Sequence, residues 1–270
     1  MSSVSRVRSG RWLPILTYHR VVPSPPPQDP AGNCVTVATF ESHLRWLAAS
    51  GYSSVSLAAV GRSFIEGTGA IDPLPRRPVV LTFDDGYRDN YDLAWPLLKQ
   101  YGFTATIFLV SDSIGGYNSF DADLPGDPVP MLSWQQVREM RSGGITFGSH
   151  TCSHPRTLIG LDDARLRYEL AESKATLETG LNAPVDQFSY PHDQLDGRVE
   201  TAVEAAGYRL ACAGVGSRFS RYCLTRVSPP RRAAGRARDA LPNSLALRFF
   251  ERRLKWSVNG FLAERQKTPR

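Results

Sequence analysis

The 270-residue chain has few of the features that mark disulfide-rich and membrane-spanning proteins. Its four cysteines are sparse for this length and form no CxxC pair, which predicts free thiols in a reducing compartment. We expect these four residues to be small buried hydrophobic side chains: Cys34, Cys152, Cys212 and Cys223. No run of 18 or more apolar residues occurs, so no membrane-spanning helix is expected.

A secretory signal is also not expected, because the short apolar stretch Trp12–Leu16 is interrupted by Pro14 and continues into polar residues. We therefore expect a cytoplasmic protein.

Lysine is scarce, since 28 of the 32 basic residues are arginine, and the net charge of +6 is unevenly distributed. Residues 1–11 carry three arginines and no acid. Residues 12–225 carry 17 basic against 23 acidic residues, and residues 226–270 carry 12 against 3. The acidic body lacks the basic stripe that nucleic-acid binding requires, so no nucleic-acid partner is expected.

The remaining composition, 41% hydrophobic and 21% charged, predicts a globular domain with a substantial core. Short apolar or β-branched runs alternate with longer segments of helical period. The expected strands are 15–18, 79–83, 104–110, 145–148, 187–190 and 208–213. The expected helices are 39–50, 90–101, 133–141, 161–179 and 197–206, with Thr39 and Ser133 as N-caps. This alternation predicts an α/β fold, a β/α barrel of about seven parallel strands.

We expect three parts: the barrel over residues 12–227, a linker rich in Pro, Arg and Ala over 228–243, and a basic amphipathic helix over 244–270. Apolar side chains follow helical spacing along one face of that helix, at Leu247, Phe250, Leu254, Val258 and Phe261. Packing against the barrel is the favoured interpretation. Peripheral contact with the inner face of a membrane is the alternative.

The strand at 79–83 runs directly into Asp84, Asp85 and Gly86. Adjacent carboxylates at the carboxyl end of a buried parallel strand lie where barrel active sites are built. Because neighbouring side chains point in different directions, one carboxylate can bind a metal while the other takes a proton from water. An ordinary Asp-Gly turn is the alternative interpretation.

His150 and His154 follow the expected strand at 145–148. Their spacing can place two imidazoles on one side of a helical turn, as in some zinc sites. Two polar loop residues bonded to backbone would explain the pair equally simply. Together with Asp85, however, the histidines form a three-ligand set that leaves open positions for water and substrate, which is typical of a catalytic metal site.

Two further segments reach the same edge of the predicted sheet. Tyr190, Pro191 and His192 end a strand, and Pro191 leaves the next backbone N–H free to point into a pocket as an oxyanion donor. His19 ends the first strand and can face the same mouth. The alternatives are an ordinary strand-ending turn and a structural histidine, and His43 fits the latter description.

In combination and order, these motifs resemble the polysaccharide deacetylase family of carbohydrate esterases. The resemblance rests on LTFDDGY at 81–87, GSHTCSHP at 148–155 and FSYP at 188–191. YHRV at 18–21 extends it toward the branch that deacetylates poly-N-acetylglucosamine.

The resemblance implies a distorted β/α barrel that hydrolyses the N-acetyl group of a carbohydrate. Asp84 would be the general base, and Asp85, His150 and His154 would hold a divalent metal, zinc being expected and cobalt, nickel or manganese the alternatives. Many members use a late histidine as the acid, but none follows His192 here, so His19 is the predicted substitute.

The chain also departs from the family at the third motif, where Ser189 stands in place of an arginine and His192-Asp193 in place of a glycine. Two other functions remain as alternatives: a metal-independent glycosidase and a non-catalytic glycan-binding relative. The sequence does not specify which sugar is the substrate or the oligomeric state.

Overall fold

The computed structural model describes residues 13–26, 29, 32–61, 74–214 and 220–229. The strands are β1 (Ile15–Tyr18), β2 (Arg20–Val22), β3 (Cys34–Thr36), β4 (Ser53–Ser54), β5 (Pro78–Phe83), β6 (Thr106–Leu109), β7 (Thr146–Ser149), β8 (Gln187–Ser189), β9 (Leu210–Ala213) and β10 (Leu224–Thr225). The α-helices are α1 (Val37–Ala49), α2 (Leu57–Val60), α3 (Trp95–Tyr101), α4 (Trp134–Ser142), α5 (Asp163–Leu181) and α6 (Gly197–Ala205). Four shorter helical turns are η2 (Asn90–Ala94), η3 (Ser111–Ser113), η4 (Ser119–Asp121) and η5 (Pro191–Asp193).

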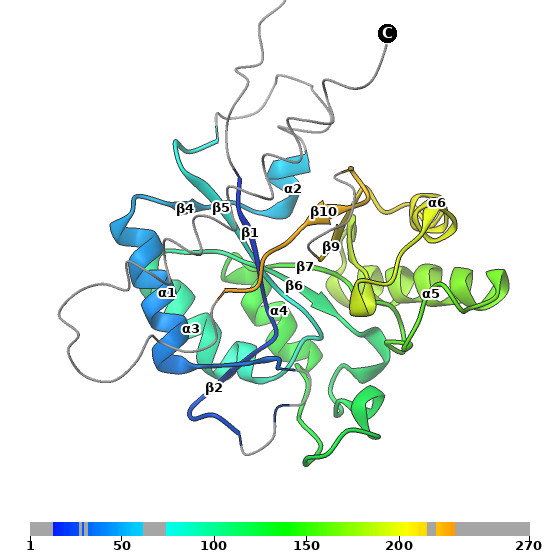
Figure 1. Ribbon diagram of the computed structural model, residues 1–270, viewed down its shortest axis with the longest axis horizontal. Coiled ribbons are helices and arrows are strands. Elements are labelled where there is room, and N and C mark those ends of the chain that lie inside the picture. The colour runs from blue at the N-terminus through cyan, green and yellow to red at the C-terminus, as the bar shows by residue number, and fades with distance from the viewer. Residues whose placement is uncertain (1–12, 27–28, 30–31, 62–73, 215–219, 230–270) are drawn as a thin grey trace, which may run out of the picture.

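Seven parallel strands form a barrel with the order β1-β5-β6-β7-β8-β9-β10. The circle is closed by a parallel bridge between Leu16 and Val227, whose N–H donates to the carbonyl of Ile15 at 2.9 Å. Helices lie around the strands, with α1 and α3 on one side and α5 and α6 on the other (Figure 1). The expectation of an α/β fold with a distorted seven-stranded barrel is therefore confirmed.

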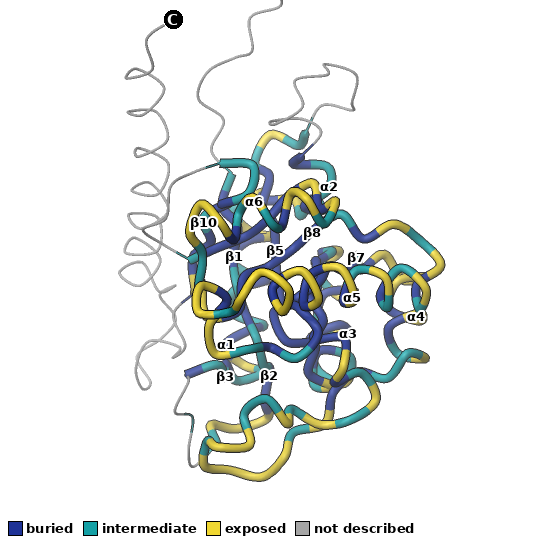
Figure 2. The backbone as a smooth tube through the Cα atoms, turned by 90° about the vertical axis from the view of Figure 1, so that its right-hand side faces the viewer, coloured by how far each residue is buried: buried dark blue, intermediate teal, exposed yellow. Residues whose placement is uncertain are grey.

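Side chains alternate along the strands between the barrel interior and the helical layer. Val80 and Leu224 belong to a small interior cluster that Leu57 of α2 also joins. A larger cluster, which includes Leu81 and Phe83, packs between the strands and the helices. The strands are accordingly buried while the helices keep exposed outer faces (Figure 2). Each step of two residues from Val80 leads up the barrel to Asp84.

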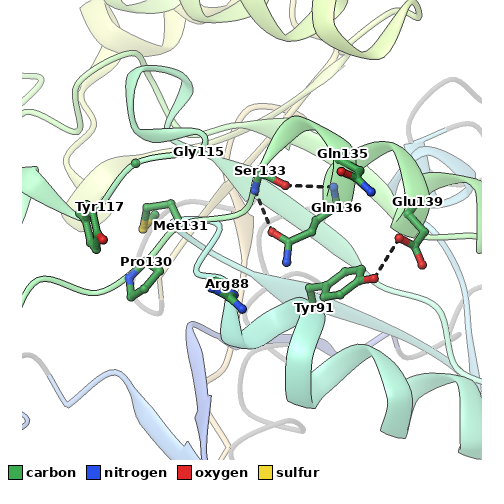
Figure 3. A pocket seen from close by; sticks show the side chains of 11 residues that line it. Arg88, Tyr91, Gly115, Tyr117, Pro130, Met131, Ser133, Gln135, Gln136 and Glu139 are labelled. Atoms are coloured by element: carbon green, nitrogen blue, oxygen red, sulfur yellow. Dashed lines mark hydrogen bonds between the residues drawn. The ribbon is translucent and has the colours of Figure 1, made fainter.

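The predicted strands and helices all have counterparts, although several ends shift by one or two residues. Ser133 caps α4 as predicted, in a reciprocal capping box with Gln136 (Figure 3). The prediction of Thr39 as an N-cap was wrong, because the hydroxyl of Thr36 accepts the N–H of Thr39 and α1 begins at Val37. His43 is hydrogen-bonded to the Tyr18 hydroxyl at 3.2 Å, in keeping with a structural role.

Most of the predicted linker and the whole predicted helix at 244–270 lie outside the described residues. Their placement on the barrel or on a membrane stays a prediction. Within the described part of the chain, every helix is too short or too polar to cross a membrane.

Candidate functional site

A pocket of about 610 Å³ opens at the carboxyl ends of the barrel strands. It brings together the side chains that the sequence singled out, and its lining includes His19, Asp84, Asp85, His150, His154 and His192. They come from segments that follow β1, β5, β7 and β8. Parallel strands thus deliver residues far apart in the chain to one end of the barrel.

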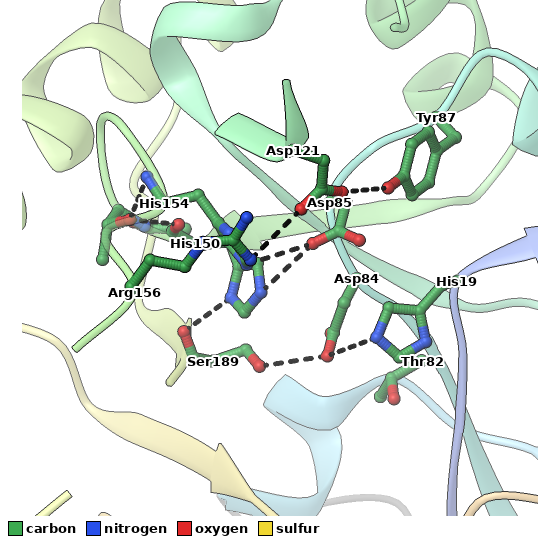
Figure 4. A network of polar contacts seen from close by, with 12 residues as sticks. His19, Thr82, Asp84, Asp85, Tyr87, Asp121, His150, His154, Arg156 and Ser189 are labelled. Carbon is green, nitrogen blue, oxygen red and sulfur yellow. Dashed lines mark hydrogen bonds and ion pairs between the residues drawn. The ribbon is translucent and has the colours of Figure 1, made fainter. Parts of the chain in front are cut away.

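Asp85, His150 and His154 converge on one point at the floor of this pocket. The Asp85 Oδ1 atom lies 3.4 Å from Nε2 of His150 and 3.5 Å from Nε2 of His154. Their three ligand atoms lie within 4.8 Å of one another, and all three residues are buried (Figure 4). Among the residues that the structure describes, none is a hydrogen-bond partner of Asp85 Oδ1, an arrangement that a bound cation would satisfy. The donor set therefore fits a divalent metal.

Both imidazoles direct Nε2 toward this point, and each must carry an unprotonated Nε2 to bind a metal. Nδ1–H of His150 donates to the carbonyl of Ser189 at 2.8 Å, which fixes the tautomer with a free lone pair on Nε2. Burial lowers the pKa of His154 to about 3, so its imidazole is neutral at neutral pH. A metal ligand must be unprotonated, and His154 meets that condition. Burial alone would lower the pKa of His150, but Asp85 and Asp84 hold it above its ordinary value, so a bound metal would have to displace a proton from this ring.

The segment from His150 to His154 is a loop, so the expectation of a helical turn was wrong. Thr151 and His154 have positive φ angles of 71° and 55°, which a helix does not allow. The hydroxyl of Thr151 accepts the N–H of His154 at 3.1 Å and closes the turn. The thiol of Cys152 lies against the α5 backbone, away from the three candidate ligands.

Glu169 of α5 holds this loop in place. Its buried carboxylate accepts the backbone N–H groups of Cys152 at 2.9 Å and Ser153 at 3.0 Å, and also the Ser153 hydroxyl. Arg165 pairs with the same carboxylate at 2.7 Å. The sequence analysis did not identify Glu169, and the i, i+4 spacing from Arg165 was the available signal for its pairing.

Replacing Glu169 with glutamine is expected to weaken metal binding by about 10- to 100-fold, the usual effect of losing support behind a ligand. The amide offers one acceptor oxygen where the carboxylate serves several donors at once. Titration of the metal-free variant with cobalt or zinc, followed by absorption or by calorimetry, measures the change. Glu172→Gln, exposed on the same helix, is the matched control. Equal affinities for the two variants would contradict this role.

Asp84 lies on the other side of the pocket from Asp85, His150 and His154, and it forms an ion pair with Arg226. The two nitrogens Nη1 and Nη2 of Arg226 donate to the two carboxylate oxygens at 2.6 and 2.7 Å, with both residues buried. Nη2 also donates to the hydroxyl of Ser189 at 2.9 Å. Burial alone would raise the pKa of Asp84, but the charge of Arg226, aided by His150 and His19, holds it below its ordinary value. Asp84 is therefore an anion at neutral pH.

Arg226 is the residue that the sequence analysis missed, because it was counted as the first charge of the basic tail. It lies directly after β10 and two residues beyond Leu224, whose side chain is inside the barrel. The two-residue period therefore turns Arg226 inward as well. It supplies the guanidinium that the third motif, with Ser189, does not provide. The alternation in Leu224–Val227 was the signal that could have identified it.

His19 lies at the opposite edge of Asp84, with Nε2 at 3.9 Å from Asp84 Oδ2 and about a quarter of its side chain exposed (Figure 4). The backbone carbonyl of His19 accepts a hydrogen bond from the Asn90 amide at 2.7 Å. The structure thus brings His19 to the pocket mouth, where a proton donor to substrate would stand.

Tyr190 and His192 of the segment predicted to supply an oxyanion donor also line the pocket. Tyr190 contributes neither of its donors, because its N–H bonds to the carbonyl of Cys212 and its hydroxyl to the carbonyl of Tyr222. Pro191 is buried and has no N–H, while His192 lies with its ring 4.7 Å from that of His154. The N–H of His192 is thus the donor of this segment that still fits the prediction.

Backbone strain is concentrated around the pocket. Six non-glycine residues in the described part of the chain have positive φ, and Asn182, which caps α5, lies away from the site. The other five are Asp85, Thr151, His154, His192 and Asp193. Such conformations cost about 1–3 kcal/mol each and persist where the surroundings enforce them, typically at functional sites.

The segment 111–131, called the rim segment below, covers one side of the pocket. Phe120 packs on His154 with ring centroids 4.6 Å apart. Asp121 accepts from the Tyr87 hydroxyl and pairs with Arg156 at 3.6 Å (Figure 4). The Phe120 contact helps to orient His154, whose Nδ1 has no hydrogen-bond partner in the described part of the chain.

Comparison with known proteins agrees with this geometry. The polysaccharide deacetylase family profile matches residues 72–211, which is just over half of the chain and includes Asp84, Asp85, both loop histidines and the FSYP motif. The chain belongs to the polysaccharide deacetylase family. The expected enzyme class, a carbohydrate deacetylase, is confirmed, and the glycosidase and glycan-binding alternatives lose their support.

Two curated relatives illustrate the range of the family. YxkH of Bacillus subtilis, which carries a polysaccharide deacetylase description, is 32% identical over 222 residues, covering 80% of this chain and 70% of YxkH. The poly-beta-1,6-N-acetyl-D-glucosamine N-deacetylase of Escherichia coli K12 is 34% identical over 125 residues. That match covers 43% of this deacetylase but only 17% of the E. coli protein.

Solved structures show the same fold at low sequence identity. IcaB from Ammonifex degensii superposes with a TM-score of 0.67 at 23% identity, covering 92% of this chain and 97% of IcaB. The Streptococcus pyogenes deacetylase PplD, solved with acetate, gives 0.66 at 22% identity, covering 89% and 97%. The deacetylase barrel is thus shared over nearly its whole length.

Proposed function

We propose that this deacetylase removes the N-acetyl group from N-acetylglucosamine units of a glycan or glycolipid precursor, with a divalent metal, most simply zinc, held by Asp85, His150 and His154. The observation that carries the proposal is the convergence of those three ligands beside an ionised Asp84 in one pocket. The poly-N-acetylglucosamine deacetylases among its relatives support the choice of sugar.

Several residues of the pocket have distinct tasks in this reaction. A metal bound by the three ligands would polarise the acetyl carbonyl and lower the pKa of water. Asp84 accepts the proton of the attacking water, because Arg226 keeps it ionised and fixes both of its oxygens. The N–H of His192 donates to the oxygen that becomes negative as water attacks.

Collapse of the tetrahedral intermediate requires a proton for the leaving amine. His19 is the donor in this proposal, because it lies at the pocket mouth 3.9 Å from Asp84. The imidazole can receive the proton that Asp84 has taken and pass it to the amine nitrogen. The same proton is thus removed from water and returned to the product.

Acetate release from a panel of N-acetylated sugars tests the proposal. Metal-loaded protein is expected to release acetate from β-1,6-linked or β-1,4-linked N-acetylglucosamine oligomers. No release from any sugar by folded, metal-loaded protein would overturn it.

In the same assay His19→Ala should lower kcat with little change in KM, and a near-normal rate would remove His19 from the role of acid.

Replacing Arg226 with glutamine is expected to move the acid limb of the kcat/KM profile to higher pH. Without the guanidinium, burial dominates and the pKa of Asp84 rises, so a higher pH is needed to ionise the base. Because Arg226 lowers this pKa in the native protein, the ion pair stabilises the fold above the unfolded-state pKa of about 3.9 and loses this effect below it.

Loss of Arg226 leaves a buried carboxylate without its cation, so the free energy of unfolding near pH 7 should also fall by about 3–5 kcal/mol. Urea denaturation at several pH values measures this loss of unfolding free energy. The exposed Arg167 of α5, replaced by glutamine, is the control. An acid limb that does not move in Arg226→Gln would contradict the role assigned to the pair.

A further inference from the structure

A second pocket, of about 460 Å³, lies beside the catalytic pocket at the same end of the barrel. Its walls come from the segment after β5, from the segment 115–117 and from the first turns of α4 (Figure 3). Tyr91 and Tyr117 supply aromatic surface, while Arg88, Gln135, Gln136 and Glu139 supply polar groups. The reaction described above uses none of these six side chains.

The two pockets are separated by a thin wall. Tyr87, which bridges to Met131, stands between Asp85 in the catalytic pocket and Arg88 in the second pocket. Three residues of chain span at most about 11 Å, so the linings of the two pockets approach each other closely at this point. The rim segment serves both sides as well, since Asp121 lines the catalytic pocket and Tyr117 the second.

The Tyr117 side chain is 58% exposed at the edge of the pocket, although the backbone beneath it is fixed. Tyr117 bridges to Pro130, and the neighbouring Asn118 accepts the N–H of Val129 through its side chain and donates its own N–H to the carbonyl of Val129. A preordered, exposed aromatic ring offers a flat surface on which a ligand can stack at little cost in conformational entropy. The flat apolar face of a sugar ring is a suitable partner.

The polar groups retain unused hydrogen-bonding capacity. Gln136 accepts the Ser133 N–H through Oε1, which leaves its amide NH₂ as a donor (Figure 3). The Tyr91 hydroxyl donates to Oε2 of Glu139 at 2.9 Å, which leaves Oε1 as an acceptor. Among the described residues, Gln135 has no side-chain hydrogen bond in the structure. Planar amide and carboxylate groups around an aromatic ring suit hydroxyl-rich ligands.

The side chains that line the second pocket also argue against a phosphate-bearing or lipid ligand. Arg88 is the one basic side chain that lines the pocket; its Nε donates to Asp92, and Glu139 adds a negative charge. An acyl chain would leave the glutamine and glutamate side chains without partners, at a cost in free energy.

We propose that this second pocket binds a neighbouring sugar unit of the glycan whose acetylated unit lies in the catalytic pocket, with Tyr117 as the stacking platform. The proposal rests on the glycan deacetylase function proposed above. It makes the enzyme selective for oligomers over single sugars. Loss of one aromatic contact should reduce the affinity for long oligomers about 3- to 10-fold.

The test compares kcat/KM for N-acetylglucosamine oligomers of increasing length. Wild type should prefer the longer oligomers, whereas Tyr117→Ala and Gln135→Ala should lose that preference through KM and keep the wild-type rate on the shortest substrate. Tyr168→Ala is the matched control, because Tyr168 is a 49% exposed tyrosine of α5 that lines neither pocket. An unchanged ratio of long to short substrates in Tyr117→Ala would overturn the proposal.

Direct binding separates this inference from the proposed reaction. The Asp84→Asn protein, titrated calorimetrically with the same oligomers, should bind a long oligomer several-fold more weakly once Tyr117→Ala is added. Binding that ignores Tyr117, or no binding of any oligomer, overturns the second pocket. Failure of the panel assay with Tyr117-dependent binding intact would instead overturn the proposed reaction alone.

Discussion

Replacement of Asp84 by asparagine is expected to lower kcat for acetate release by about 100- to 10,000-fold, the usual contribution of a general base. Asparagine keeps the size of the side chain and one acceptor oxygen for Arg226, but it cannot accept the proton of the attacking water. Substrate binding should change far less, so the loss belongs in kcat. Steady-state kinetics on the best sugar of the panel gives both constants.

The same substitution leaves the buried charge of Arg226 uncompensated, which lowers the free energy of unfolding by up to about 3–5 kcal/mol. Stability must therefore be measured beside activity. Urea denaturation and cobalt titration establish whether the variant is folded with its metal ligands intact. Asp127→Asn, on an exposed part of the rim segment, is the control. A folded, metal-binding Asp84→Asn enzyme with near-normal kcat would exclude Asp84 as the base.

Removal of the metal by a chelator is expected to reduce activity by about 1,000-fold or more, because the polarising cation is worth several kcal/mol to the transition state. Adding back zinc should restore the rate. Asp85 Oδ1 has no hydrogen-bond partner in the structure, so rebinding should also stabilise the fold. At one hundred times its Kd, a metal adds about 2.7 kcal/mol, which corresponds to a rise in Tm of about 5–10 °C.

Replacing His154 with alanine tests the same metal site by mutation, because it removes one of the three proposed ligands. Both the rate and the metal-dependent shift in Tm should disappear at metal concentrations that saturate the wild type. His43→Gln, which changes a histidine outside the pocket, should retain both effects. Activity that survives complete chelation, checked by elemental analysis, would exclude a metal-assisted reaction.

The barrel and the residues of the candidate metal site could be predicted from the chain because their signals are local. A strand reads as a run of buried residues, and the residue directly after it must lie at the strand's carboxyl end. Asp85, His150 and His154 each follow a strand within a few residues, so placing the strands also placed the ligands. The enzyme class then followed from the order of motifs.

The predictions that were wrong concern conformation set by distant partners. The spacing of His150 and His154 fits a helical turn, but Glu169 on α5 binds the intervening N–H groups and holds a strained loop instead. Thr39 resembles an N-cap, yet the hydroxyl of Thr36 lies in position to cap first. Neither competition can be decided from local residue types, because the deciding hydrogen bonds depend on packing.

The strand pattern and the order of the motifs by themselves determined the class of fold, the enzyme class and the three residues of the candidate metal site. Only the tertiary structure decided how Asp84 and Asp85 coexist. The two neighbouring carboxylates receive different partners: Asp85 faces the histidines, and Asp84 takes the guanidinium of Arg226. Arg226 lies 142 residues away and reads in the sequence as the start of a basic tail. Closure of the barrel at Leu16 and Val227 turns that arginine inward, because alternate residues of a strand point to opposite faces.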